Sequence, residues 1–149
     1  MPQPFRYFLR VRYQECDAQG VVFNARYADY VDIATMEFFR CIGFAEDVAS
    51  GELDVQLVKQ TTTWKAPARN NQALEIAVLT KALGTTSFTL VTQFRIAGHE
   101  AITCEVETVY VRVDGKTLTK QPLGDRFREG LKRGAPGVTV DHAAHLTHP

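Results

Sequence analysis

Apolar and polar residues alternate at residues 5–13. The apolar face carries Phe5, Tyr7, Leu9, Val11 and Tyr13, and the opposite face carries Arg6, Phe8, Arg10 and Arg12. A period of two residues is typical of a β-strand that buries one of its faces. The pattern therefore predicts a half-buried strand at the start of the chain.

The spacing of the apolar residues becomes helical after Asn24. One stripe contains Tyr27, Val31, Ala34, Phe38 and Cys41, and it is widened by Tyr30, Ile33, Met36 and Phe39. Asn is favourable at the start of a helix, where its side chain caps a free N–H at a gain of about 1 kcal/mol. Gly43 is placed to end the helix. Because the helix is apolar over most of its circumference, we expect it to be largely enclosed.

Four strand-like segments follow a polar, loop-like stretch at residues 45–54. They cover about residues 55–65, 74–83, 87–97 and 101–113. The connections between them are short, which favours antiparallel neighbours in a sheet. The third segment is the clearest, because one of its faces carries Phe88, Leu90, Thr92, Phe94 and Ile96.

The last part of the chain has weaker patterns. A turn at residues 114–115 leads to a short strand predicted at 117–120, and residues 122–132 fit a short amphipathic helix. Residues 134–149 are interpreted as a flexible tail. Residues 1–133 then form a single domain, as expected for a chain of 149 residues.

The order of these elements predicts an α+β fold in which an antiparallel β-sheet wraps around one long central α-helix. The strand at 74–83 carries apolar residues on both faces, which are Leu74, Ile76 and Val78 on one and Ala77, Leu79 and Leu83 on the other. A second buried surface would account for this, so the pattern indicates a homo-oligomer.

Charge and composition exclude several classes of protein. Lys and Arg number 17, and so do Asp and Glu, so the formal net charge is zero, which argues against a protein that coats nucleic acid. No apolar run approaches the roughly 20 residues of a membrane span, and the N-terminus lacks the features of a signal peptide. We therefore expect a cytoplasmic protein. An anionic small ligand is still compatible with the sequence, because its binding depends on local charge.

The cysteines and histidines give no clear metal site. Cys16, Cys41 and Cys104 have neither disulfide-framework nor metal-pair spacing, so we expect reduced thiols, with the last two in the core. The spacing of His142, His145 and His148 could chelate a metal, but a solvated tail is the favoured interpretation. His99 fits a hairpin turn. We expect no metal and no cofactor.

Candidate chemistry lies where the first strand leads into the helix. Glu15 and Asp17 stand in a turn that contains Gly20, four residues before Asn24. The free N–H groups of a helix start can stabilise an oxyanion, and a nearby carboxylate can act as general base or nucleophile. By spacing alone, a plain Asx-type turn before a capped helix is the simpler interpretation.

The motif Asp17-x-x-Gly20-Val21-Val22-Phe23-x-x-x-Tyr27, placed between a strand and a long helix, resembles the signature of the 4-hydroxybenzoyl-CoA thioesterase family. These proteins are hotdog-fold acyl-CoA thioesterases, and the similarity in element order extends over roughly residues 5–120. The resemblance implies that Asp17 is the catalytic carboxylate and that the backbone N–H of Asn24, and less directly that of Phe23, binds the oxyanion. With this resemblance, a catalytic loop becomes the preferred interpretation over a plain turn.

The resemblance also implies a shared site. Active sites of the family lie at a dimer interface, with CoA across the surface, so we expect a homodimer or homotetramer that binds an acyl-CoA or acyl-carrier substrate. The implied substrate-binding residues are Gly20, Val22, Tyr27, Asp32, Thr62, Thr63 and Trp64, with Val58 as a further pocket wall. It is an equally good interpretation that Asp32 lies on a solvated face of the helix. It is likewise an equally good interpretation that Trp64 takes part in ordinary core packing. Candidates for the CoA phosphates are Lys65, Arg69, Lys81 and Arg95.

Other functions fit the sequence less well. A Ser-His-Asp hydrolase is excluded, because the only serines are Ser50 and Ser87, no nucleophile-elbow motif is present and the chain is short. A hydratase or dehydratase of the same fold usually relies on a His near an acidic residue, and none stands in the predicted helix or loop. A non-catalytic acyl-CoA or acyl-carrier binding module stays open as an alternative, although Asp17 favours thioester hydrolysis.

Overall fold

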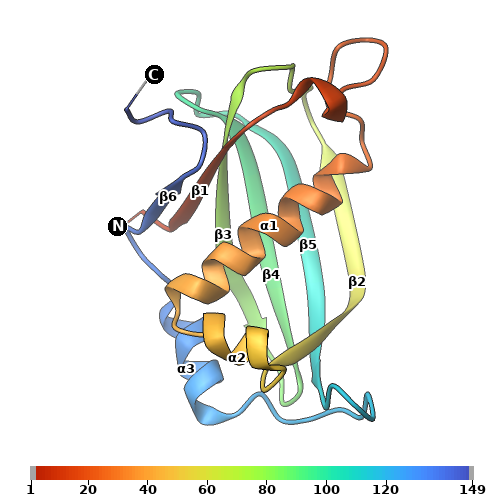
Figure 1. Cartoon of the computed structure of the whole chain (residues 1–149), viewed down its shortest axis with the longest axis vertical. Helices are drawn as coiled ribbons and strands as arrows, with labels where there is room; N and C mark the ends of the chain where they lie inside the picture. The colour runs from red at the N-terminus through yellow and green to blue at the C-terminus, as the bar shows by residue number, and fades with distance from the viewer. Residues whose placement is uncertain (1–2, 148–149) are drawn as a thin grey trace.

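A six-stranded sheet wraps around helix α1 (Arg26–Cys41) in the computed structural model, which describes residues 3–147 (Figure 1). The strands are β1 (Phe5–Arg10), β2 (Asp54–Trp64), β3 (Ala73–Leu83), β4 (Ser87–Ile96), β5 (Ile102–Val113) and β6 (Thr139–Asp141). Their order is β2-β5-β4-β3-β1-β6, and all neighbours are antiparallel except β1 and β6. This arrangement confirms the predicted α+β hotdog fold.

The core lies between α1 and the sheet and is rich in aromatic residues. Tyr27 of α1 meets Phe94 of β4 edge to face, with ring centroids 5.2 Å apart, and Phe39 meets Phe88 in the same way at 6.2 Å. Such tilted pairs are favourable beyond the apolar area that they bury. The inward residues of β4 are those that the alternating pattern predicted.

Strand β1 is shorter than the alternation predicted. It ends at Arg10, and Tyr13 begins the 3-10 helix η1 (Tyr13–Glu15), where its side chain is exposed. The backbone N–H of Arg12 donates to the carboxylate of Glu15 at 2.8 Å, which closes a turn that a strand could not contain. A local side-chain bond thus competes with the strand pattern and ends it.

Helix α1 differs from its prediction at both its start and its outer face. Ala25, not Asn24, is the N-cap residue, and no side chain caps the helix. The inner face is buried, but Ile33 and Met36 are 37% and 42% exposed, so the single chain covers α1 on one side only. The prediction of a largely enclosed helix is therefore wrong for one protomer.

Two short segments also depart from the sequence pattern. Residues predicted as a loop form helix α2 (Ala45–Ser50), which ends at Gly51 in the left-handed conformation. The strand predicted at 117–120 is absent, and only an isolated bridge joins Val113 to Lys120. Helix α3 (Asp125–Arg133) confirms the predicted amphipathic helix, and its Phe127 packs against rings of the core.

The C-terminal segment is structured where a flexible tail was predicted. Strand β6 pairs in parallel with β1, from Arg6 with Thr139 to Phe8 with Asp141. The Asp141 carboxylate accepts the backbone N–H groups of Ala143, His145 and Leu146 at 3.0, 3.2 and 2.8 Å. This segment thus covers an edge of the sheet that would otherwise be unpaired.

Two of the tail histidines, His142 and His145, contact side chains of β1. Nδ1 of His142 lies 3.0 Å from the hydroxyl of Tyr7, and the ring of His145 stacks on Phe8. His148 lies outside the described residues. His99 occupies the β4–β5 turn, as predicted, with its N–H donating to the carbonyl of Ile96.

The cysteines are free thiols in the part of the chain that the structure covers. Cys104 is buried in the core, as predicted, whereas Cys16 and Cys41 are only partly buried. Burial raises the pKa of the Cys104 thiol to about 12, and the charge of Glu105 adds to this effect. No helix within residues 3–147 is long and apolar enough to cross a membrane.

Candidate functional site

The Asp17 loop, residues 16–22, is a tight hairpin fixed by its own backbone. The N–H of Asp17 donates to the carbonyl of Val21, and the N–H of Gly20 donates to the carbonyl of Asp17, both at 2.9 Å. Gly20 has a φ of 76°, a left-handed conformation that favours glycine. The N–H of Val22 donates to the carbonyl of Ala68 at 2.8 Å, which attaches the loop to the segment after β2.

The carboxylate of Asp17 is held by one oxygen. Its Oδ1 accepts the N–H of Gln19 at 2.8 Å and that of Val21 at 3.5 Å, which is the Asx turn that the spacing suggested. Within residues 3–147, Oδ2 has no hydrogen-bond partner. The Asx turn therefore orients the carboxylate and leaves one oxygen available to a ligand.

The backbone at the start of α1 distinguishes the two predicted oxyanion donors. The N–H of Phe23 donates to the carbonyl of Glu15 at 2.9 Å, so it is already used. The N–H of Asn24 has no acceptor among the described residues. Its carbonyl accepts the N–H of Tyr27 at 3.4 Å, and the carbonyl of Phe23 accepts that of Arg26 at 2.9 Å. Asn24 therefore offers a free donor at the positive end of the helix dipole.

A cleft of about 390 Å³ brings most of the predicted site residues together. Its walls are Asp17, Val21, Val22, Phe23, Asn24, Tyr27, Trp64, Lys65, Ala66 and Pro67. The rings of Phe23 and Trp64 are about half exposed, so both present apolar surface to a ligand. Burial raises the pKa of Tyr27 to about 12, which keeps its hydroxyl neutral at physiological pH.

Several predicted residues do not line this cleft in the single chain. Gly20 shapes the Asp17 loop, while Thr62 and Thr63 lie on β2 next to Trp64. Asp32 lies on the exposed side of α1, where partial burial and then the charge of Asp29 raise its pKa. Val58 is also exposed on β2, at a bulge opposite β5.

The candidate phosphate-binding residues fall in different places. Lys65 lines the cleft, and Arg69 is next to it, because a bridge joins Arg69 to Val21. Lys81 is paired with Glu107 at 2.8 Å on the outer face of the sheet. Arg95 lies in a different pocket. Lys65 and Arg69 are thus the two candidates close to Asp17.

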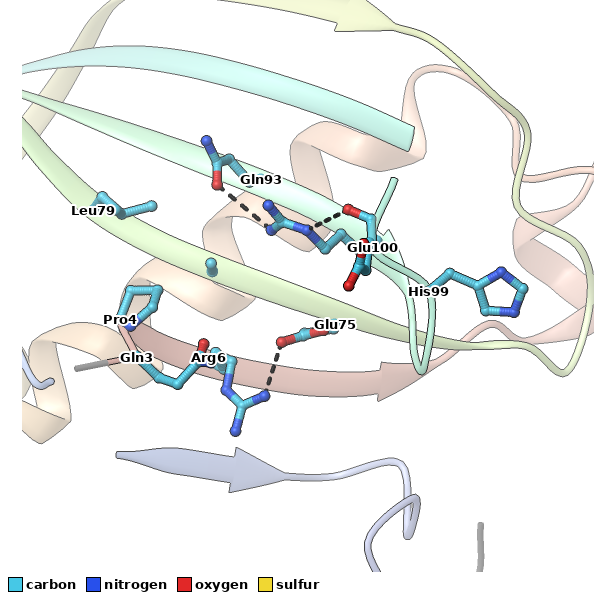
Figure 2. Close-up of a pocket in the computed structure, with 10 residues that line it drawn as sticks. Gln3, Pro4, Arg6, Glu75, Leu79, Gln93, His99 and Glu100 are labelled. Atoms are coloured by element: carbon cyan, nitrogen blue, oxygen red, sulfur yellow. Dashed lines mark hydrogen bonds and ion pairs between the residues drawn. The ribbon is translucent and has the colours of Figure 1, made fainter. Parts of the chain in front are cut away.

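A second, larger pocket lies away from the Asp17 loop. It has a volume of about 550 Å³ and lies on the outer face of the sheet, where Figure 2 shows its polar side chains. Two of its arginines are held inside the protein: Arg6 pairs with Glu75 at 2.9 Å, and Nε of Arg95 donates to the carbonyl of Glu100 at 3.1 Å. None of the residues that line this pocket stands at the start of a helix, so its carboxylates have no helix-start N–H like that of Asn24 beside them, and it is the weaker candidate for catalysis.

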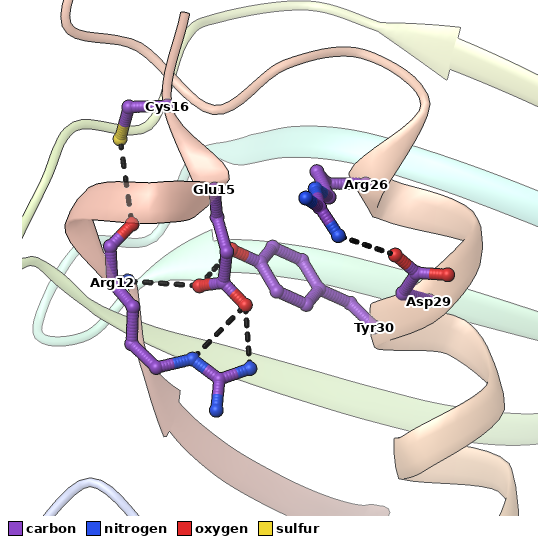
Figure 3. Close-up of polar contacts among 6 residues, drawn as sticks. All are labelled: Arg12, Glu15, Cys16, Arg26, Asp29 and Tyr30. Atoms are coloured by element: carbon purple, nitrogen blue, oxygen red, sulfur yellow. Dashed lines mark hydrogen bonds and ion pairs between the residues drawn. The ribbon is translucent and has the colours of Figure 1, made fainter.

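A buried polar cluster beside the Asp17 loop was not assigned a role from the sequence. The side chain of Glu15 lies between Arg12 and Tyr30 (Figure 3), and Glu15 is 4% exposed. Burial alone would raise the pKa of Glu15, but hydrogen bonds from Arg12 and Tyr30 outweigh it and hold the pKa below its ordinary value. The Arg12-x-x-Glu15 spacing, typical of a reciprocal turn, was the only sequence signal of this cluster.

Comparisons with known proteins identify the family of the chain. A family model described as the thioesterase-like superfamily matches residues 11–133. The acyl-CoA thioester hydrolase YbgC of Escherichia coli O6:H1 is 32% identical over 120 residues, which are 80% of this chain and 89% of that protein.

Solved structures agree on the fold. A hypothetical protein from Aquifex aeolicus has a TM-score of 0.75 at 25% identity, covering 86% of this chain and 99% of that one. The structure of BH1999 gentisyl-coenzyme A thioesterase has a TM-score of 0.75 at 23% identity, covering 85% and 98%. The matched superfamily is broader than the 4-hydroxybenzoyl-CoA family that the motif resembles.

The lowered pKa of Glu15 predicts an acid dependence of stability. In the unfolded chain Glu15 titrates near its ordinary value of 4.5, and in the folded protein it titrates lower. The stabilisation of the folded state by the Glu15 carboxylate is therefore complete above pH 4.5 and is lost as the pH falls through the folded pKa. We expect Glu15→Gln to lower the free energy of unfolding by about 1–3 kcal/mol at neutral pH, and this difference to shrink on acidification.

Urea unfolding of both proteins between about pH 7 and about pH 3 measures this difference. Glu75→Gln, which removes an ion pair on the outer face, is the matched control. A difference between wild type and Glu15→Gln that stays constant over the whole range would contradict the assignment.

Proposed function

Because the chain belongs to the thioesterase-like superfamily, we propose that it hydrolyses acyl-CoA thioesters in the cleft beside Asp17. One observation carries the proposal: an oriented carboxylate with a free oxygen and a backbone N–H without an acceptor line the same cleft. The similarity to a protein named acyl-CoA thioester hydrolase supports the choice of substrate class.

In the proposed reaction, the thioester carbonyl lies between Asp17 and the N-terminus of α1. As a general base, Asp17 takes a proton from water while the water oxygen attacks the carbonyl carbon. Negative charge develops on the carbonyl oxygen, which accepts the N–H of Asn24. The carbon–sulfur bond then breaks, and the leaving CoA thiolate takes the proton from Asp17, which regenerates the carboxylate and leaves the free acid. Since no His lines the cleft, this chemistry fits the site better than hydration or dehydration does.

A nucleophilic route uses the same two groups. Asp17 would attack the carbonyl carbon itself, release the thiolate and form an anhydride that water then hydrolyses. Only this route attaches the acyl group to Asp17, so the mass of enzyme quenched during turnover distinguishes it from general base catalysis.

The substrate would lie across the cleft with its ends in different surroundings. Phe23, Tyr27 and Trp64 offer aromatic walls to an acyl group, and Lys65 and Arg69 offer charge to the CoA phosphates. Thr62, Thr63 and Asp32 would then serve a cleft formed with a second chain.

The free edge of β2 supports a dimer as the active unit. Among residues 3–147, strand β2 pairs only with β5, and its Leu57, Val58 and Trp64 are exposed. An exposed edge strand with apolar side chains is a template for pairing with another chain. Met36, on the outward side of α1, lies near the start of β2, because Met36, Leu53 and Val55 line one pocket. We propose that a second copy covers this surface.

Substitution of Asp17 tests the catalytic assignment. With a panel of short, long and aryl acyl-CoAs, we expect Asp17→Asn to lower kcat by about 10²–10⁴-fold, because Asn is neither a base nor a nucleophile here. Thiol release is the measurement. Asp29→Asn removes an exposed helix carboxylate paired with Arg26 and should retain activity. Full activity in Asp17→Asn would refute the assignment, and an inactive wild type would favour a binding module.

Removal of the Asn24 N–H tests the oxyanion donor. Pro at this position lacks the N–H and keeps the carbonyl, so we expect Asn24→Pro to lower kcat by about 10²–10³-fold. Asn24→Ala keeps the N–H and loses a side chain that caps nothing, so it should retain both activity and stability. Loss of kcat in folded Asn24→Ala would show instead that the side chain takes part.

A charge on the β2 edge tests the dimer. Val58→Lys places an ammonium group in the proposed interface, and we expect the dissociation constant of the dimer to rise at least about tenfold, with a parallel loss of activity. Leu118→Lys is the matched control, because Leu118 and Val58 are 56% and 57% exposed. Sedimentation velocity measures both variants. A wild-type monomer that is active at micromolar concentration would contradict the shared site.

A further inference from the structure

The buried carboxylate of Glu15 is the most completely bonded charged group near the proposed site. Its Oε1 accepts the backbone N–H of Arg12 and the hydroxyl of Tyr30, both at 2.8 Å. Its Oε2 accepts Nε of Arg12 at 3.1 Å and a terminal guanidinium nitrogen at 2.6 Å (Figure 3). One side chain thus joins the turn after β1 to the second turn of α1.

The backbone of Glu15 reaches the other side of the site. Its carbonyl accepts the N–H of Phe23 at 2.9 Å, and Phe23 immediately precedes Asn24. Glu15 is also two residues before Asp17, on the strand side of the Asp17 loop. Glu15 is therefore bonded to residues before and after the Asp17 loop, which are Arg12 and Phe23. Its partners Phe23 and Tyr30 also lie on either side of Asn24, which presents the free N–H.

Tyr30 continues the connection toward the cleft. Its ring contacts Tyr27 edge to face, with centroids 5.9 Å apart, and Tyr27 lines the cleft. Both rings also contact Phe94 in the sheet. The Glu15 carboxylate therefore ties the Asp17 loop to a part of α1 that the core holds fixed.

The polarity of this cluster needs an explanation beyond stability. Burying a carboxylate is costly, and well-packed apolar residues of similar volume are often as stable or more stable. A hydrogen-bonded carboxylate, however, fixes direction as well as contact, because its bonds have defined geometry. Direction matters where a displacement of about 1 Å can lower a rate about 10²-fold.

We propose that Glu15 is a positioning residue, whose side chain holds the Asp17 carboxylate in its catalytic geometry by bonding the Asp17 loop to Arg12 and Tyr30, while its carbonyl bonds Phe23 on the other side of the loop. The inference rests on the proposed function, since it gives these bonds a purpose in thioester hydrolysis. Glu15 itself contacts no reacting atom.

The test combines two substitutions in one cycle. We expect Glu15→Gln to lower kcat by about 10–10²-fold with little change in KM, because the Asp17 carboxylate is displaced while the aromatic walls Phe23, Tyr27 and Trp64 remain. On the Asp17→Asn background, Glu15→Gln should have almost no further effect on kcat, because the group that it positions is gone. If Glu15→Gln lowered kcat only by reducing the amount of folded protein, its effect on kcat would instead multiply with that of Asp17→Asn.

Tyr30→Phe provides a second variant if Glu15→Gln folds poorly. It keeps the ring in the core and removes only the hydroxyl, and we expect kcat to fall about 3–10-fold, again without further effect on the Asp17→Asn background. Glu75→Gln, which breaks the ion pair with Arg6 on the outer face, should leave kcat unchanged.

The outcomes separate this inference from the proposed function. Unchanged kcat in folded Glu15→Gln and Tyr30→Phe, or effects that multiply with Asp17→Asn, would overturn the positioning role while Asp17 keeps its own. Full activity in Asp17→Asn alone would overturn the proposed function instead. A fall in kcat that disappears on the Asp17→Asn background supports the positioning role.

Discussion

The burial of one aromatic face of α1 against the sheet is the constraint on which the rest of the molecule depends. Tyr27, Tyr30 and Phe38 are almost completely buried, and their rings contact Phe94 and Phe5 on the strands. Close packing of such large rings allows little sliding of the helix. The N-terminus of α1, with its free N–H, is thereby fixed beside the end of β2 and the Asp17 loop.

The same packing leaves the outer face of α1 uncovered. A helix can bury only the face that the sheet covers, and here Ile33 and Met36 stay exposed. Strand β2 has the same property, since it lies at the edge of the sheet with both faces largely accessible. The proposed cleft lies where β2 ends, and the ring of Trp64 at this end is about half exposed. These features together favour a site completed by a second chain.

The fold was predictable where the signal was local and repeated. The period of α1 and the alternation in β4 each extend over many residues, so both elements were found. Helix α2 was missed because it has no buried residue and therefore no apolar stripe. Strand β6 was missed because it has only three residues and pairs with β1 at the other end of the chain. Its stability comes from a partner that no local pattern contains.

The site shows the same division between local and distant information. Asp17, Gly20, Phe23, Asn24 and Tyr27 lie within one short motif, which is why the sequence could indicate them together. The motif did not show which N–H is free, because that depends on the carbonyl of Glu15 accepting the N–H of Phe23. Nor did it place Lys65 in the cleft, since the segment after β2 meets the Asp17 loop through tertiary contacts, which are the bond from Val22 to Ala68 and the bridge between Val21 and Arg69. A sequence motif therefore indicates the candidate groups, while the tertiary hydrogen bonds decide which of them are left unpaired.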